Sequence, residues 1–129
     1  MVTDLAASRD FYLSALAPLN FVEAEDSGAH FVRLTNGTDM VIVLAPVEAR
    51  FQERGYHRKS VGMNHFAISV DRKEDVDAMS VYLQQMRIPL LGSGTFETTY
   101  RGGYCGLMFE DPDRIMIEIV HHHSHYFDL

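Results

Sequence analysis

Little cysteine, little positive charge and no long apolar run narrow the class of protein to which this 129-residue chain can belong. One cysteine, Cys105, cannot form an intrachain disulfide, which favours a reducing compartment. The 18 Asp and Glu residues outnumber the 11 Lys and Arg residues, and a net charge of −7 argues against sequence-independent binding to nucleic acid. No apolar run approaches the roughly 20 residues that cross a bilayer, and no secretory signal is visible. We therefore expect a cytoplasmic protein without nucleic-acid or membrane partners.

The rest of the composition is that of an ordinary globular domain, with 47% apolar and 22% charged residues. A chain of this length can bury a core without disulfides, so we expect one domain.

The first half of the chain reads as one helix followed by three strands. Apolar residues at helical spacing follow Asp4, a possible N-cap, and Pro18 ends the pattern. Asn36-Gly37 is typical of a hairpin turn. The three extended segments expected here are residues 21–24, 30–34 and 40–44, and a polar stretch without a clear pattern follows at 46–62.

The second half repeats this order and adds a strand before its helix. Residues 64–70 alternate like a strand, and Asp71 with Glu74 forms a possible capping pair for a helix that carries apolar residues on one face. Three more extended segments are expected at 90–95, 104–109 and 115–120. We predict an α+β fold of two paired βαβββ modules with curved mixed sheets around a shared cavity, the first module lacking its opening strand. The predicted parts are module one at 1–45, a linker at 46–62, module two at 63–120 and a tail at 121–129.

Two residues within the predicted strands could hold a metal ion. His65 shares a strand face with Ala67 and Ser69, which resembles a cavity wall more than a core. Glu118 interrupts an otherwise apolar strand, where a carboxylate is costly to bury unless it is paired or bound to a metal. The alternatives are a histidine that is hydrogen-bonded inside the sheet and a glutamate that faces solvent from an edge strand.

Three motifs in the right order resemble the vicinal oxygen chelate superfamily of glyoxalases, bleomycin resistance proteins and type I extradiol dioxygenases. Residues 2–12, VTDLAASRDFY, resemble its V-x-D-L-x-x-S-x-x-F-Y opening, and residues 64–70, NHFAISV, resemble its second-module strand. Residues 109–118 resemble its closing F-x-D-P-D-G-x-x-x-E pattern, with Arg114 where glycine is usual.

The resemblance implies that His65 and Glu118 are ligands of a divalent metal, and that the substrate is a small molecule bound through two vicinal oxygens. Val43 or a neighbouring apolar residue stands where glyoxalase I has a glutamate. The dioxygenase triad would need a further histidine on a strand before Asp4, about six residues upstream; either the sequence starts late or the protein lacks this ligand. An extradiol-type dioxygenase with Fe(II) is favoured. The alternatives are a glyoxalase-type isomerase or lyase with Zn, Mn or Ni, and a metal-free antibiotic-binding protein. A homodimer is expected.

Other candidate residues carry weaker signals. Tyr104 follows two glycines and could donate a hydrogen bond to the bound substrate, or be an ordinary strand tyrosine. Cys105 is expected to be a buried thiol. His30 and His57 are conceivable substitute ligands, and the histidines at 121–123 and 125 are placed in the tail, outside the site.

Overall fold

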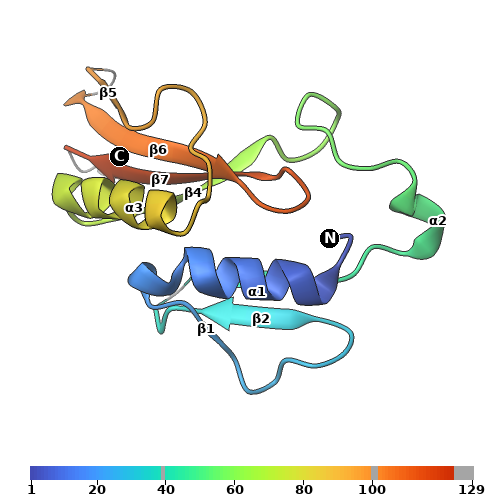
Figure 1. Ribbon diagram of the computed structural model, residues 1–129. Coiled ribbons are helices and arrows are strands. Elements are labelled where there is room, and N and C mark those ends of the chain that lie inside the picture. The colour runs from blue at the N-terminus through green and yellow to red at the C-terminus, as the bar shows by residue number, and fades with distance from the viewer. Residues whose placement is uncertain (39, 100–101, 124–129) are drawn as a thin grey trace. The chain divides into compact units, whose positions relative to one another are not determined.

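A computed structural model describes residues 1–38, 40–99 and 102–123 (Figure 1). The chain forms two compact units, Met1–His57 with Asp111–Arg114, and Arg58–Glu110 with Ile115–Leu129. No helix within the described ranges is long and apolar enough to cross a membrane. The elements in order are α1 (Leu5–Ala15), a 3-10 turn (Ala17–Leu19), β1 (Val22–Glu23), β2 (Val32–Thr35), β3 (Val41–Leu44), α2 (Ala49–Gln52), β4 (His65–Ser69), α3 (Lys73–Gln85), β5 (Phe96–Thr98), β6 (Tyr104–Glu110) and β7 (Met116–His122).

The first unit packs α1 against an antiparallel sheet in the order β1-β2-β3. As predicted, Asp4 is the N-cap of α1, and its carboxylate accepts a hydrogen bond from the Ala7 amide at 2.9 Å. Along β2 alternate residues are buried, and Val32, Leu34 and Leu44 form the sheet side of the core. The sequence periodicity therefore predicted this helix and its three strands to within two residues.

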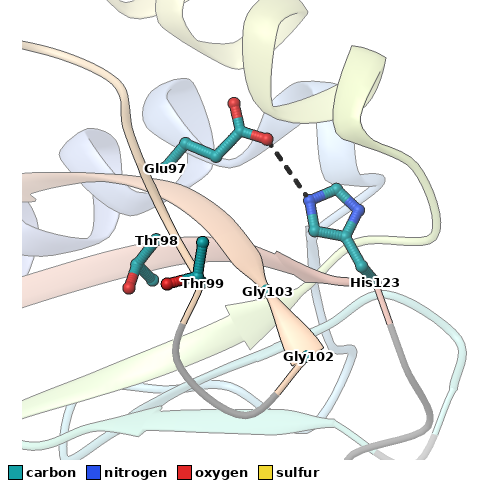
Figure 2. Close-up of a pocket in the computed structure, with 6 residues that line it drawn as sticks. All are labelled: Glu97, Thr98, Thr99, Gly102, Gly103 and His123. Carbon is teal, nitrogen blue, oxygen red and sulfur yellow. Dashed lines mark ion pairs between the residues drawn. The ribbon is translucent and has the colours of Figure 1, made fainter.

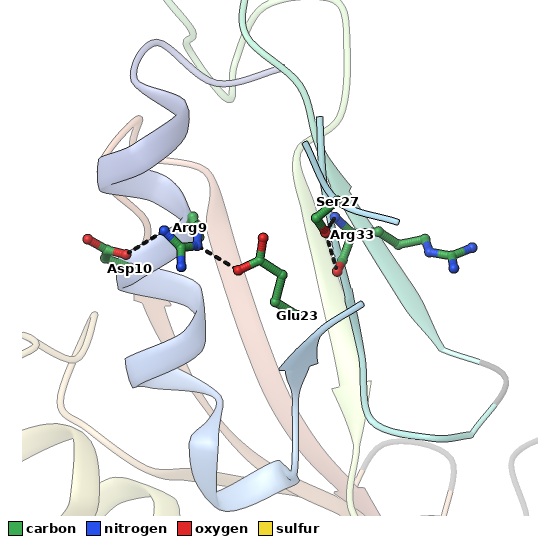
Figure 3. A network of polar contacts seen from close by, with 5 residues as sticks. All are labelled: Arg9, Asp10, Glu23, Ser27 and Arg33. Atoms are coloured by element: carbon green, nitrogen blue, oxygen red, sulfur yellow. Dashed lines mark hydrogen bonds and ion pairs between the residues drawn. The ribbon is translucent and has the colours of Figure 1, made fainter. Parts of the chain in front are cut away.

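Polar contacts connect α1 to β1, and Ser27 to Arg33, at the surface of this unit (Figure 3). Arg9 on α1 pairs with Glu23 on β1 at 2.7 Å and with Asp10 at 3.8 Å. The hydroxyl of Ser27 accepts from the Arg33 amide at 3.0 Å and donates to the Arg33 carbonyl at 3.3 Å. These contacts are exposed or half-buried, so they define the local geometry more than they stabilise the fold.

The second unit is a four-stranded mixed sheet in the order β4-β7-β6-β5, with α3 against one face (Figure 1). The edge strand β4 runs parallel to its neighbour β7, and the other pairs are antiparallel. The core on the α3 side comprises Val76, Met79, Leu83, Ile68, Leu107, Phe109, Ile117 and Ile119.

Several expected boundaries in the second half are wrong. The N-cap of α3 is Arg72 rather than Asp71, and the Asp75 carboxylate accepts from the Arg72 amide at 3.2 Å. The strand expected at 90–95 is absent from these described residues because Gly92 and Gly94 have φ values of 66° and 100°, which no strand adopts. β5 begins only at Phe96.

The closing strand and the linker also differ from expectation. β7 continues to His122, two residues beyond the predicted end, so His121 and His122 belong to the sheet and not to a tail. The linker, predicted to lack a pattern, contains the single turn of helix α2.

The opening strand of the first module is reduced to one residue among those described. Val2 forms an isolated parallel bridge with Pro46, through hydrogen bonds from the Val2 amide to the Ala45 carbonyl at 2.8 Å and from the Val47 amide to the Val2 carbonyl at 2.9 Å. In the second unit the equivalent position is a five-residue strand, β4. The predicted α+β class, with a helix and a curved sheet in each unit, is confirmed.

Gly106 gives a first prediction, because its missing side chain leaves room for a ring. A Cβ at Gly106 would lie 2.8 Å from the Ile119 carbonyl oxygen and 3.0 Å from the Phe96 ring. We expect Gly106→Ala to lower the free energy of unfolding by about 2 kcal/mol, since overpacking forces neighbours to shift. Gly28→Ala is the control, because a Cβ there meets nothing within 4 Å. Urea denaturation that shows equal effects of the two substitutions would contradict the crowding at Gly106.

Candidate metal centre

His65 and Glu118 lie on the sheet face of the second unit that α3 leaves uncovered. Along β4, His65, Ala67 and Ser69 are exposed while Ile68 is buried, which confirms the alternation expected from the sequence. In the parallel pair, His65 lies opposite Met116 and Ala67 opposite Glu118. We call this side of the sheet the open face; it carries His65, Ala67, Ser69, Phe96, Thr98, Tyr104, Gly106, Met108, Glu110, Met116, Glu118, Val120 and His122.

The two side chains meet diagonally across the β4–β7 pair. The Nε2 atom of His65 lies 3.5 Å from the Oε2 atom of Glu118. Two atoms that each bind one divalent ion at roughly 2.1 Å, at a tetrahedral angle, are roughly 3.4 Å apart. The observed separation therefore matches that of two ligands of a single ion. The His65 side chain is 38% exposed and the Glu118 side chain 9%, so solvent reaches the pair from the histidine side.

The Glu118 carboxylate is buried, which affects its protonation. Burial raises its pKa, and the nearby His65 and His122 side chains lower it by less. Within the described part of the chain, its one ion-pair partner is the His65 imidazole. Burying a charged carboxylate costs folding free energy, and a bound divalent cation would offset that cost by neutralising the charge. The chemistry and spacing of these two side chains are those of two ligands of one divalent ion.

A second histidine–carboxylate pair, at the other end of the sheet, has a different electrostatic setting. Glu97 and His123 line a pocket with Thr98, Thr99, Gly102 and Gly103, and His123 Nε2 lies 3.6 Å from Glu97 Oε1 (Figure 2). Lys73 pairs with Glu97 at 2.7 Å and, as the main cause, lowers its pKa. Because this exposed carboxylate already has a cationic partner, it has less need of a metal than Glu118 has.

The residues that the structure describes supply no third ligand beside this pair. No group of three or more His, Cys, Asp and Glu side chains among them could hold a metal ion. His30 and His57, named as possible substitutes, are exposed residues of the first unit. Cys105 is buried, as expected, and burial raises its pKa.

The repeated hydrogen-bond pattern of the two units shows which residue of the first unit is equivalent to Glu118. The Val2 amide bonds to the Ala45 carbonyl just as the Val70 amide bonds to the Val120 carbonyl. Val2 is therefore equivalent to Val70, and Ala45 to Val120. Counting back two residues along each strand places Val43 at the position of Glu118, which is the correspondence that the resemblance implied.

Tyr104 lies on the open face but away from the histidine–glutamate pair. It is opposite His122, four residues along β6 from Met108, which is opposite Glu118. Four residues of strand span roughly 13 Å. The Tyr104 ring instead packs against two other rings. Its centroid lies 5.7 Å from that of Phe96 and 5.5 Å from that of His122. The structure thus joins Tyr104 to an aromatic cluster at the far end of the face.

His122 also lies on this face, although it was predicted to belong to a tail. It follows Glu118 by four residues along β7, and residues an even number apart in a strand share a face. That spacing was visible in the sequence, but assigning the histidines to a tail concealed it.

Comparison with known proteins agrees with this architecture. A sequence model of the Glyoxalase/Bleomycin resistance protein/Dioxygenase superfamily matches residues 1–119. The chain belongs to this superfamily. Uncharacterized protein YqjT of Bacillus subtilis (strain 168) is 33% identical over 119 residues, which cover 92% of this chain and 91% of that protein.

Solved structures of the superfamily share the fold. A provisionally assigned glyoxalase from Bacillus halodurans superimposes with a TM-score of 0.75 at 27% identity, covering 94% of this chain and 90% of that one. A glyoxylase/bleomycin resistance protein/dioxygenase domain from Frankia sp. EAN1pec gives a TM-score of 0.76 at 21% identity, covering 97% and 88%. Lactoylglutathione lyase from Agrobacterium tumefaciens gives 0.67 at 16% identity, covering 93% and 87%. The last two similarities concern the fold alone.

Proposed function

We propose that this protein is a metal-dependent enzyme that binds a small organic substrate through two vicinal oxygens, with His65 and Glu118 as protein ligands of the metal. The observation that carries the proposal is the buried Glu118 carboxylate, 3.5 Å from the Nε2 atom of His65. Members of the superfamily usually bind a divalent metal, which agrees with this assignment.

The residues around the pair have distinct roles in this proposal. A bound divalent ion would supply Lewis acidity and a template for the substrate oxygens. His65 and Glu118 would hold it, while the apolar side chains of Met108, Met116 and Val120 would keep water from the neighbouring surface. Tyr104 remains a candidate hydrogen-bond donor, now to the far end of a bound molecule rather than to its chelated oxygens.

The extradiol-type dioxygenase remains the favoured reaction class, with Fe(II) as its metal. One histidine and one carboxylate are two members of the two-histidine, one-carboxylate triad typical of such iron sites. Val43 at the position equivalent to Glu118 removes the further carboxylate that a glyoxalase-type site would use. A glyoxalase-type isomerase or lyase with Zn, Mn or Ni is the alternative within the enzyme class.

A metal-free protein that binds an antibiotic or another small molecule is the second candidate. It is favoured by the finding that the described residues contain no group of three potential ligands. We also propose a cytoplasmic homodimer. Three exposed valines of the first sheet, Val22, Val41 and Val43, are consistent with an apolar contact surface.

Metal titration of the full chain separates the two candidates. His123→Ala/His125→Ala is the reference protein, because clustered histidines bind added metals. We expect one Co²⁺ per chain by calorimetry, and a rise in melting temperature that grows with the metal concentration. Activity would then be sought with catechols after anaerobic Fe(II) loading, and next with α-keto thiol adducts. If no ion binds, while an apolar ligand binds equally well before and after His65→Ala, the enzyme proposal is wrong and the binding protein is the better interpretation.

A further inference from the structure

The side chain of Asn64 connects the end of the linker to the candidate metal ligand. Its Nδ2 atom donates a hydrogen bond to the Arg58 carbonyl oxygen at 3.1 Å. Its Oδ1 atom lies 2.8 Å from the Nδ1 atom of His65. A carbonyl oxygen can only accept a hydrogen bond, so the NH₂ end of the amide must face Arg58. The orientation of the amide is therefore fixed, and its oxygen faces His65.

This orientation determines which ring nitrogen of His65 carries the proton. An amide oxygen only accepts hydrogen bonds, so the Nδ1 atom of His65 must donate. In the neutral imidazole, the Nε2 atom then keeps its lone pair. Nε2 is the atom that lies 3.5 Å from the Glu118 carboxylate. The nitrogen that faces the carboxylate is thus the one left free to bind a metal.

The acceptor of the Asn64 amide is itself fixed to the same sheet. The Arg58 guanidinium forms an ion pair with Glu110 at the end of β6, and both side chains are partly buried. Glu110 is opposite Met116, which is opposite His65, so these residues form one row across the open face. Arg58 therefore contacts both Glu110, through its guanidinium, and Asn64, through its backbone carbonyl.

We propose that Asn64 is a positioning residue, which selects the Nδ1-protonated form of His65 and directs its Nε2 lone pair toward Glu118. Its value for metal binding rests on the proposed function, whereas the choice of tautomer is a property of the metal-free protein. A histidine side chain free in water favours the opposite, Nε2-protonated form. The neighbouring amide therefore imposes a state that His65 would not otherwise prefer.

Ring ¹⁵N–¹H correlation spectra of the metal-free full chain at pH 8 test the tautomer. The His65 signals are assigned by their loss in His65→Gln. We expect a protonated Nδ1 and an unprotonated Nε2 in the native protein. Asn64→Ala should shift His65 toward the Nε2-protonated form, whereas Asn64→Asp, which keeps an acceptor, should retain the native form. Asn36→Ala, the same substitution in a turn of the first unit, should leave the His65 signals unchanged.

Co²⁺ titration of the same variants tests the consequence for binding. Loss of a hydrogen-bonded partner of a ligand typically weakens metal affinity 10- to 100-fold. We expect a loss in about that range for Asn64→Ala and substantial recovery in Asn64→Asp. A tautomer that responds to Asn64 in a protein that binds no metal would support the positioning role and overturn the proposed function. An Nε2-protonated His65 in the native protein, or an unchanged tautomer in folded Asn64→Ala, would overturn the inference itself.

Discussion

Glu118→Gln is expected to weaken the binding of one Co²⁺ ion by more than about 100-fold, because it removes a ligand directly and not merely a partner of one. The substitution keeps the size and shape of the side chain, so packing against the sheet should persist. Calorimetric titration in the His123→Ala/His125→Ala background measures the loss without competition from these two histidines.

Glu97→Gln is the matched control for this substitution. Glu97 is also a strand glutamate beside a histidine, but Lys73 pairs with it at 2.7 Å. We expect its replacement to leave the Co²⁺ affinity almost unchanged. In a protein that retains His123, strong loss in Glu97→Gln together with retention in Glu118→Gln would place the metal in the pocket of Figure 2 instead.

Glu118→Gln should also change how the stability of the metal-free protein depends on pH. Burial raises the Glu118 pKa above its ordinary value of 4.5, so the folded state favours the protonated carboxyl. The resulting penalty is absent below pH 4.5, grows as the pH rises toward the raised pKa, and is complete above it. Urea denaturation should therefore show the variant to be the more stable protein at pH 7, with a smaller difference at pH 4. A variant that is less stable than the native protein at pH 7 would contradict the prediction that burying the Glu118 charge destabilises the metal-free protein.

Tyr12→Phe is expected to cost about 2 kcal/mol of unfolding free energy. Tyr12 is 2% exposed, and its hydroxyl donates to the Asp111 carboxylate at 2.9 Å. Asp111 is also buried, and the substitution leaves its Oδ2 atom without this donor. Hydrogen bonds to charged groups contribute roughly 1.5–3 kcal/mol, and a buried acceptor that loses its donor is costly.

The control for Tyr12→Phe is the same substitution at Tyr104. Among the described residues, Tyr104 makes ring contacts that a phenylalanine would preserve. We expect Tyr104→Phe to change the free energy of unfolding by less than about 0.5 kcal/mol. Urea denaturation that ranks Tyr104→Phe as the more destabilising change would show that the hydrogen bond to Asp111 does not hold the turn at 111–114 to α1.

Local patterns predicted the elements best where backbone geometry alone decides them. The alternation that placed His65 on the open face follows from the pleat of a strand. The strand at 90–95 was wrong because Gly92 and Gly94 adopt positive φ values, a choice that the apolar pattern does not encode. The end of β7 was missed because His122 is held in the sheet by pairing with Tyr104, which is distant in the sequence.

The candidate site was only partly predictable, because its geometry depends on contacts between residues that are distant in the sequence. Residue type and strand position indicated both His65 and Glu118. Their separation depends on the parallel register of β4 and β7, which no local pattern specifies. Asn64 was not recognised, because its importance depends on the position of the Arg58 carbonyl and of the His65 ring together.

Anomalous diffraction from a crystal of the full chain soaked in Co²⁺ tests the central claim most directly. The predicted result is one strong anomalous peak roughly 2.1 Å from the His65 Nε2 atom and at a similar distance from a Glu118 carboxylate oxygen. Peaks confined to the histidines at 121–123 and 125, with none between His65 and Glu118, would contradict the proposed metal centre.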